Sequence, residues 1–221
     1  MFYARPDGPL LPLAVEPRLA SWMGAGHPDQ IRLVRFLTHA EALLGPRLRA
    51  LTGPLALRLD IGLPRSVALL DQHDLDNYLF PLTMALSRRW GRRFASVCAS
   101  KRYADVSAIG VERALARPTP AAVDWWARVR TTASGGATAY KEQIRDRLAG
   151  LAVLPEGPVV LELAFTTGPR RHWPNLWKPT IDALDPILGS ETPGRPWHRA
   201  MAGSRRSGCT TGSSRPWETT S

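Results

Sequence analysis

Residues 53–64, GPLALRLDIGLP, alternate apolar with polar side chains, which is the period of a β-strand with one buried face. After a loop, residues 77–90, NYLFPLTMALSRRW, have the apolar spacing of an α-helix. Residues 93–114 then contain two short strand-like runs that meet near Arg102. A strand, a helix and further strands in this order predict an α/β (α+β) fold, in which a small mixed sheet packs against helices.

Upstream of this stretch, residues 1–27 are rich in proline and predicted to be irregular. Residues 28–50 carry apolar side chains at helical spacing, with Pro28 close to the expected first turn. Gly45-Pro46 lies inside this pattern, and we expect it to break or kink the helix.

Downstream, residues 118–150 are predicted to form a helical connector, interrupted by the flexible sequence ASGG. Residues 157–169 are predicted to form another strand, and residues 175–189 another helix. Residues 191–221 are rich in Ser, Thr, Gly and Arg and have no strand or helix period, which predicts an irregular basic tail.

An alternative origin for the tail is a frameshift. The dipeptide Met-Ala, read one base earlier, gives a glycine codon, and GC-rich codons for its neighbours turn RAMAGS into RDGRI. An Asp-Gly turn that opens a strand would then replace the irregular sequence.

Two segments of the chain resemble each other. GPLALRL (53–59) and GPVVLEL (157–163) share four of seven positions, and NYLFPLTMAL (77–86) and NLWKPTIDAL (175–184) share four of ten. We infer two related strand–loop–helix units, one within residues 51–117 and a truncated one within residues 151–190. The alternative is chance similarity between two amphipathic units.

Each copy has a proline four residues after an asparagine, at Pro81 after Asn77 and at Pro179 after Asn175. Proline is tolerated in the first turn of a helix, and asparagine is a favoured N-cap residue. Asn77 and Asn175 are therefore predicted to cap the two helices.

The composition is strongly basic, with 29 Lys and Arg against 19 Asp and Glu and a net charge of +10. Only Lys101, Lys141 and Lys178 are lysines, so guanidinium groups carry most of the charge. This balance is typical of a protein that binds nucleic acid, although a GC-rich genome would also enrich arginine. Because no stretch approaches 18 apolar residues, we expect a cytoplasmic protein without a membrane partner.

HDLDNYLFPLTMAL and PNLWKPTIDAL both resemble the signature of the RusA family of Holliday-junction resolvases, roughly Asp-x-Asp-Asn-x-x-Lys-x-x-x-Asp-Ala-Leu. The resemblance covers about 35 residues of the first copy and 30 of the second. It implies a small α/β endodeoxyribonuclease of DNA recombination and repair, a hydrolase that acts as a homodimer and cleaves branched DNA with aspartate-bound Mg²⁺.

The two copies match different parts of this signature. The first has Asp74, Asp76 and Asn77, but Phe80 replaces the lysine and Met84 the helix aspartate. The second matches at Asn175, Lys178, Asp182, Ala183 and Leu184, but His172 and Pro174 replace the two aspartates. The resemblance therefore implies Asp74, Asp76, Lys178 and Asp182 as catalytic residues, with Asp74 and Asp76 as the Mg²⁺ ligands.

The chemistry of phosphodiester hydrolysis suits these residue types. A hard cation takes oxygen ligands, and two aspartates at positions i and i+2 of an extended segment point the same way. Lys178 would stabilise charge on the phosphate if the two copies faced each other as a pseudo-dimer.

Each of these residues also has a structural interpretation. Asp74 and Asp76 precede a helix, where carboxylates stabilise the helix dipole. Lys178 is alternatively a solvated first-turn lysine, and Asp182 an exposed carboxylate on a helix face.

Three functions remain open from the sequence. The first is a RusA-like, Mg²⁺-dependent endonuclease that acts on branched or structured DNA, as a homo-oligomer or an internal pseudo-dimer. The second is a non-catalytic DNA-binding relative, and the third is an α/β interaction protein with no role at nucleic acids.

Overall fold

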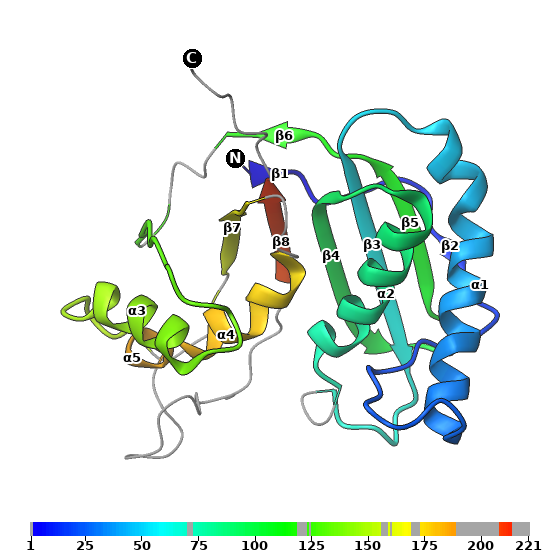
Figure 1. Cartoon of the computed structure of the whole chain (residues 1–221), viewed down its shortest axis with the longest axis horizontal. Helices are drawn as coiled ribbons and strands as arrows, with labels where there is room; N and C mark the ends of the chain where they lie inside the picture. Colours follow the sequence, from blue (N-terminus) through cyan, green and yellow to red (C-terminus); the bar gives the residue numbers. More distant parts are fainter. Residues whose placement is uncertain are drawn as a thin grey trace. The chain divides into compact units, whose positions relative to one another are not determined.

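The computed structural model describes residues 2–69, 73–118, 123, 125–155, 159, 161–168, 173–188 and, for the backbone, 208–213. The chain forms two compact units. Unit 1 comprises Met1–Pro118, Leu161–Pro174 and Ser207–Ser221, and unit 2 comprises Thr119–Val160 and Asn175–Arg206. The predicted α/β class is confirmed, because helices pack on a mixed sheet (Figure 1).

Unit 1 is built on a mixed sheet with the strand order β2-β5-β3-β4-β8-β7. The central pair, β3 and β4, is parallel, and so is the pair β7 and β8, whereas all other neighbours are antiparallel. The strands are β2 (Leu11–Pro12), β3 (Leu55–Leu63), β4 (Phe94–Tyr103), β5 (Ala108–Arg113), β7 (Glu162–Thr166) and β8 (Gly208–Ser213). A separate two-stranded sheet pairs β1 (Phe2–Tyr3) with β6 (Ala116–Arg117).

Helices α1 (Pro28–Ala50) and α2 (Leu75–Trp90) cover one face of this sheet (Figure 1). The buried side chains of α1 recur every three or four residues, as a helix with one apolar face requires. They are Leu33, Phe36, Ala40, Leu44 and Leu48. The expected break at Gly45-Pro46 is wrong, because α1 runs through both residues to Ala50.

Strand β3 is buried on both faces, whereas the alternating sequence predicted one exposed face. Residues 5–10 cover the second face: the Arg58 guanidinium donates to the Pro6 carbonyl at 3.1 Å, and a Cβ on Gly110 would lie 2.9 Å from Leu10. The charged residues of this face form hydrogen bonds with one another. Arg58 donates to the Asp60 carboxylate at 2.6 and 3.1 Å, and the Ser100 hydroxyl donates to the same carboxylate at 2.9 Å.

The helical connector is confirmed only in its second half. The sequence after ASGG forms α3 (Thr138–Leu148), whereas the described part of residues 123–137 contains no helix. The predicted irregular tail also differs. In the tail, Gly208–Ser213 forms β8 by pairing with β4 and β7.

The single helix expected over residues 175–189 is divided into three short elements. They are the 3₁₀ helix η1 (Trp173–Leu176), α4 (Trp177–Asp182) and α5 (Asp185–Leu188). Pro186 explains the last division, because it has no N–H group to donate to the carbonyl of Asp182. In unit 2, α4 packs against α3, where the Tyr140 hydroxyl lies 2.8 Å from Thr180 Oγ1.

The aligned strands of the two copies occupy corresponding positions in the sheet. In the sequence alignment of the two copies, Arg58 of β3 corresponds to Glu162 of β7. Arg58 pairs with Cys98 on β4, Glu162 pairs with Cys209 on β8, and these two cysteine positions pair with each other. The strand pairs β3–β4 and β7–β8 thus meet antiparallel at equivalent positions.

Within the described residues, no helix is long and apolar enough to cross a membrane.

Candidate functional site

The candidate site lies where β3 and β4 end and α2 begins. Because β3 and β4 are parallel, their carboxyl ends share one edge of the sheet, which is where α/β proteins commonly bind ligands. Asp74 is the N-cap residue of α2, and Asp76 lies in its first turn. Both side chains are partly exposed. Residues 70–72 of the preceding loop lie outside the described part.

The helix begins earlier than the sequence predicted, and this changes the relation between the two aspartates. Asp74 has an extended backbone, but Asp76 is already helical, so the two side chains are not held in parallel by strand alternation. Both instead stand at the positive end of the α2 dipole, where carboxylates are favourable.

Lys101 brings an ammonium group to the same edge. It lies near the end of β4, opposite Ile61 in the parallel register, and its Nζ donates to the carbonyl oxygen of His73 at 2.8 Å. The sequence pattern did not single out Lys101, because the resemblance places the family's lysine at Phe80. The signal that could have found it is its position, directly after the apolar half of β4.

Tyr78 and His73 brace the start of α2. His73 Nδ1 lies 2.5 Å from the Tyr78 hydroxyl, and the two rings stack with centroids 6.1 Å apart. Burial, together with the nearby charge of Glu16, raises the pKa of Tyr78 to about 12. The hydroxyl therefore stays protonated throughout the physiological range.

Asn77 is not the N-cap of α2, and its carbonyl has a different role. In a helix this carbonyl would accept from the N–H of residue 81, but Pro81 has none. The backbone N–H of Ala20 donates to it instead, at 2.7 Å. The Asn-to-Pro spacing thus creates an acceptor on α2 that holds the N-terminal segment beside the candidate site.

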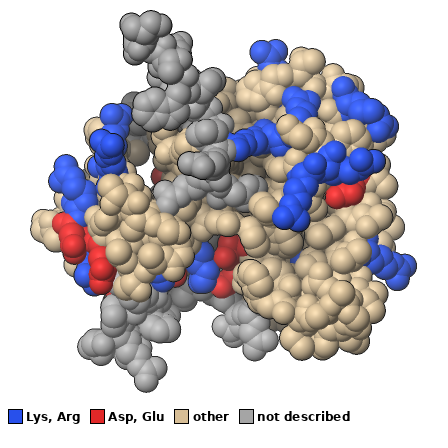
Figure 2. All heavy atoms as spheres, viewed as in Figure 1, with Lys and Arg blue, Asp and Glu red and all other residues tan. Residues whose placement is uncertain are grey.

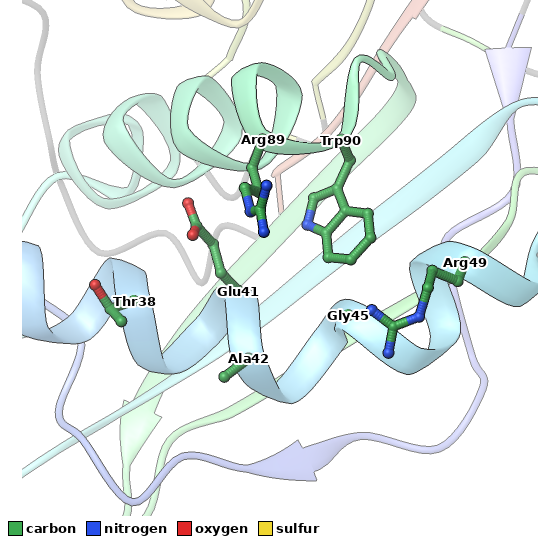
Figure 3. Close-up of a pocket in the computed structure, with 7 residues that line it drawn as sticks. All are labelled: Thr38, Glu41, Ala42, Gly45, Arg49, Arg89 and Trp90. Atoms are coloured by element: carbon green, nitrogen blue, oxygen red, sulfur yellow. The ribbon is translucent and has the colours of Figure 1, made fainter.

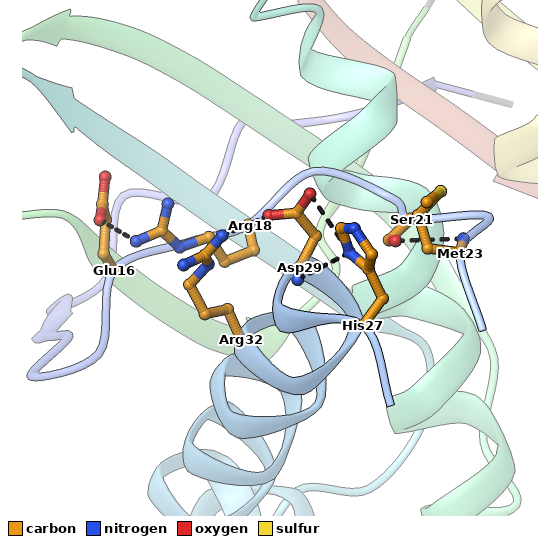
Figure 4. Close-up of polar contacts among 7 residues, drawn as sticks. All are labelled: Glu16, Arg18, Ser21, Met23, His27, Asp29 and Arg32. Carbon is orange, nitrogen blue, oxygen red and sulfur yellow. Dashed lines mark hydrogen bonds and ion pairs between the residues drawn. The ribbon is translucent and has the colours of Figure 1, made fainter. Parts of the chain in front are cut away.

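Two local, exposed charge pairs lie in the N-terminal segment and in the first turn of α1 (Figure 4). Arg18 pairs with Glu16 at 2.5 Å, and Arg32 pairs with Asp29 at 2.5 Å. The hydrogen bond from Arg32 is the main cause that lowers the pKa of Asp29. His27 caps α1 by accepting from the Asp29 N–H at 3.2 Å. Both arginines therefore have a carboxylate partner already.

The site residues of the second copy lie in unit 2, where Lys178 and Asp182 are brought together. The Asp182 carboxylate is 3.0 Å from Lys141 Nζ and 3.6 Å from Lys178 Nζ, and its side chain is only 14% exposed. The alternative of an exposed Asp182 is therefore wrong. Two ammonium groups neutralise this carboxylate, which does not favour a further cation there.

Asn175 is also not an N-cap. It lies within η1, and Leu176 occupies the N-cap position of α4. His172 lies outside the described residues.

Replacing Asp182 with Asn is expected to destabilise the chain by about 1 kcal/mol, because Lys141 and Lys178 then lose their shared counter-charge. Chemical denaturation of the wild type, Asp182→Asn, Lys141→Met and the double variant gives the coupling between Asp182 and Lys141. A coupling free energy of zero in this cycle would show that the contact between Asp182 and Lys141 does not contribute to stability.

The residues at the α2 edge fit a magnesium ion by donor type. No group of three or more His, Cys, Asp or Glu side chains suited to a metal occurs among the described residues. Magnesium, however, is commonly held by one or two carboxylates, with waters and substrate phosphate completing its shell. Asp74 and Asp76 provide such a pair.

Comparisons with family models, with curated proteins and with solved structures gave no match to this chain.

Proposed function

We propose that the chain is a RusA-like, magnesium-dependent endonuclease that hydrolyses a phosphodiester bond of branched DNA at the α2 edge. The observation that supports this most is the shared location of Asp74, Asp76 and the Lys101 ammonium group, where two parallel strands end. Two hard oxygen donors beside a cation form the donor set that phosphate chemistry requires.

Each residue has a role in this proposal. Asp74 and Asp76 would hold the magnesium ion, which when bound supplies an activated water and neutralises charge on the phosphate. Lys101 is oriented by the His73 carbonyl, and its positive charge would stabilise the phosphate oxygens. The first N–H groups of α2 point toward the same edge and favour a bound anion.

The test is cleavage of a labelled four-way junction by the full chain over a magnesium series. Cleavage is expected to require Mg²⁺ and to fall about 100-fold in Asp76→Asn, since one charge-stabilising group is lost. The matched control is Asp146→Asn, an exposed aspartate on α3 that should retain the wild-type rate. Equal rates in the two variants, or cleavage that persists without divalent ions, would contradict the proposal.

A second candidate is a DNA-binding relative without catalysis. Phe80 stands where the family has lysine, and the Asp182 carboxylate of the second copy is neutralised by two lysines. Junction binding that weakens steeply with salt, without cleavage at any magnesium concentration, would identify this function.

A further inference from the structure

Unit 1 has a groove between α1 and α2 (Figure 3). Its α2 residues, Arg89 and Trp90, end that helix, whereas Asp76 lies in its first turn. We call this groove the Arg–Trp groove; its volume is about 270 Å³. It is lined by Thr38, Glu41, Ala42, Gly45, Arg49, Arg89 and Trp90.

The indole of Trp90 organises this groove. The guanidinium of Arg49 lies 5.4 Å from the ring centroid, and that of Arg89 lies 5.8 Å from it, both within cation–π range. A Cβ on Gly45 would meet the indole at 3.1 Å, so the glycine in α1 lets the ring approach the helix closely. The indole N–H is buried and has no hydrogen-bond partner in the described structure.

The charge of the groove is not balanced. Neither Arg49 nor Arg89 forms an ion pair within the described residues, and Glu41 is the one carboxylate in the lining. Arg88 and Arg93 are exposed close by in sequence. Figure 2 shows Lys and Arg spheres gathered over the part of unit 1 where α1 and α2 end. Arginines in the last turn also complement the helix dipole, but that does not require an indole between them.

We propose that the Arg–Trp groove binds backbone phosphates of DNA, holding a duplex arm whose other end reaches the α2 edge. This rests on the proposed function for its substrate class. Planar guanidinium groups held against a ring are already oriented for bidentate phosphate contacts. Two of them on the unit that carries the proposed phosphodiester site suit a nucleic-acid backbone.

Helix α2 sets the distance between the two places. The thirteen-residue step from Asp76 to Arg89 corresponds to about 20 Å at 1.5 Å per residue. One strand of DNA advances about 3.4 Å per base pair, so the groove would meet phosphates about six base pairs from the cleaved bond.

The test is fluorescence anisotropy of a labelled four-way junction with the full chain, from low to high salt. Arg49→Ala/Arg89→Ala is expected to lower the slope of log affinity against log salt by about 1.8, at about 0.9 per phosphate contact. Its affinity at 0.15 M salt should fall about 30-fold or more. Arg49→Lys/Arg89→Lys keeps the charge, and its slope should stay near that of the wild type.

The matched control is Arg128→Ala/Arg147→Ala, which removes two exposed arginines from unit 2. Shortening the junction arms below about six base pairs should lower the affinity of the wild type to about that of the Arg49→Ala/Arg89→Ala variant. The affinity of the variant itself should change little, because it has already lost the groove contacts. If Arg49→Ala/Arg89→Ala and the control show the same salt slope and the same affinity, the Arg–Trp groove does not bind DNA phosphates, whatever the cleavage result. Binding of anionic vesicles alone, with no salt-dependent DNA binding, would also overturn the groove proposal.

Cleavage and binding separate the two proposals. If the wild type cleaves the junction and Arg49→Ala/Arg89→Ala has an unchanged salt slope, the proposed nuclease activity stands and DNA binding by the Arg–Trp groove is rejected. If the slope is reduced but the wild type does not cleave, DNA binding by the groove is supported and the catalytic function is rejected.

Discussion

Replacing Asp60 with alanine is expected to lower the free energy of unfolding by about 3 kcal/mol, because it leaves the Arg58 guanidinium without its partner inside the sheet. The Asp60 side chain is 8% exposed and that of Arg58 is 21% exposed, so the loss should lie at the low end of the range for buried pairs. Denaturant titration of both proteins measures it.

The same pair gives a dependence on pH. Burial by itself would raise the pKa of Asp60, but hydrogen bonds from Arg58 and Ser100 outweigh it and hold the pKa below its ordinary value of 3.8. A depressed carboxylate pKa adds stability that is present above the unfolded-state value and is lost as pH falls through the folded-state value. The difference in the free energy of unfolding between wild type and Asp60→Ala should therefore be constant above about pH 5 and become smaller below about pH 4.

The control for Asp60 removes both charges. Arg58→Met/Asp60→Ala should be more stable than Asp60→Ala alone, since the largely buried Arg58 guanidinium is no longer left without its carboxylate. If Asp60→Ala were no less stable than the exposed-site variant Asp146→Asn, the ion pair would have no part in holding residues 5–10 on the sheet.

Replacing Trp173 with alanine is expected to cost about 3–5 kcal/mol, the usual loss for a buried tryptophan. Trp173 is 6% exposed, its indole N–H donates to the Phe94 carbonyl at 2.9 Å, and its ring stacks on Phe165. All three residues belong to unit 1, so Trp173 holds β7 against the start of β4. Hydrogen exchange of peptides covering residues 161–168 should become faster, and the melting temperature should fall.

Trp173→Phe separates packing from hydrogen bonding. It keeps an aromatic ring against Phe165 but leaves the Phe94 carbonyl without its donor, so we expect a loss of about 1 kcal/mol. Unchanged exchange of the 161–168 peptides in Trp173→Ala would show that β7 is held by other contacts.

Local periodicity was enough to predict the central elements of unit 1. Apolar spacing predicted the helices at residues 28–50 and 77–90, and the structure confirms both with small changes at their ends. The burial of the second face of β3 was not predictable in the same way. It depends on residues 5–10, about fifty positions earlier in the chain, and Arg58 and Asp60 resemble exposed residues until their mutual pairing is known.

The candidate site shows the same division. Asp74 and Asp76 were predicted from a local motif, but the position of Lys101 follows from the parallel pairing of β3 and β4, which no local pattern encodes. The Asn-to-Pro spacing predicts that Asn77 and Asn175 cap their helices, since proline favours a first turn. Pro81 instead lies further into α2, and a donor from residue 20 makes that possible.

Across the four strands β3-β4-β8-β7, the pairings are parallel, antiparallel and parallel, so the order is the same when read from either end. In an assembly of two identical chains, every substitution is made twice, and a change that suits one half must also be tolerated by the other. Under the duplication inferred from the sequence, both halves belong to one gene, and this constraint disappears. One half would then be free to keep Asp74 and Asp76, while the other pairs Asp182 with two lysines.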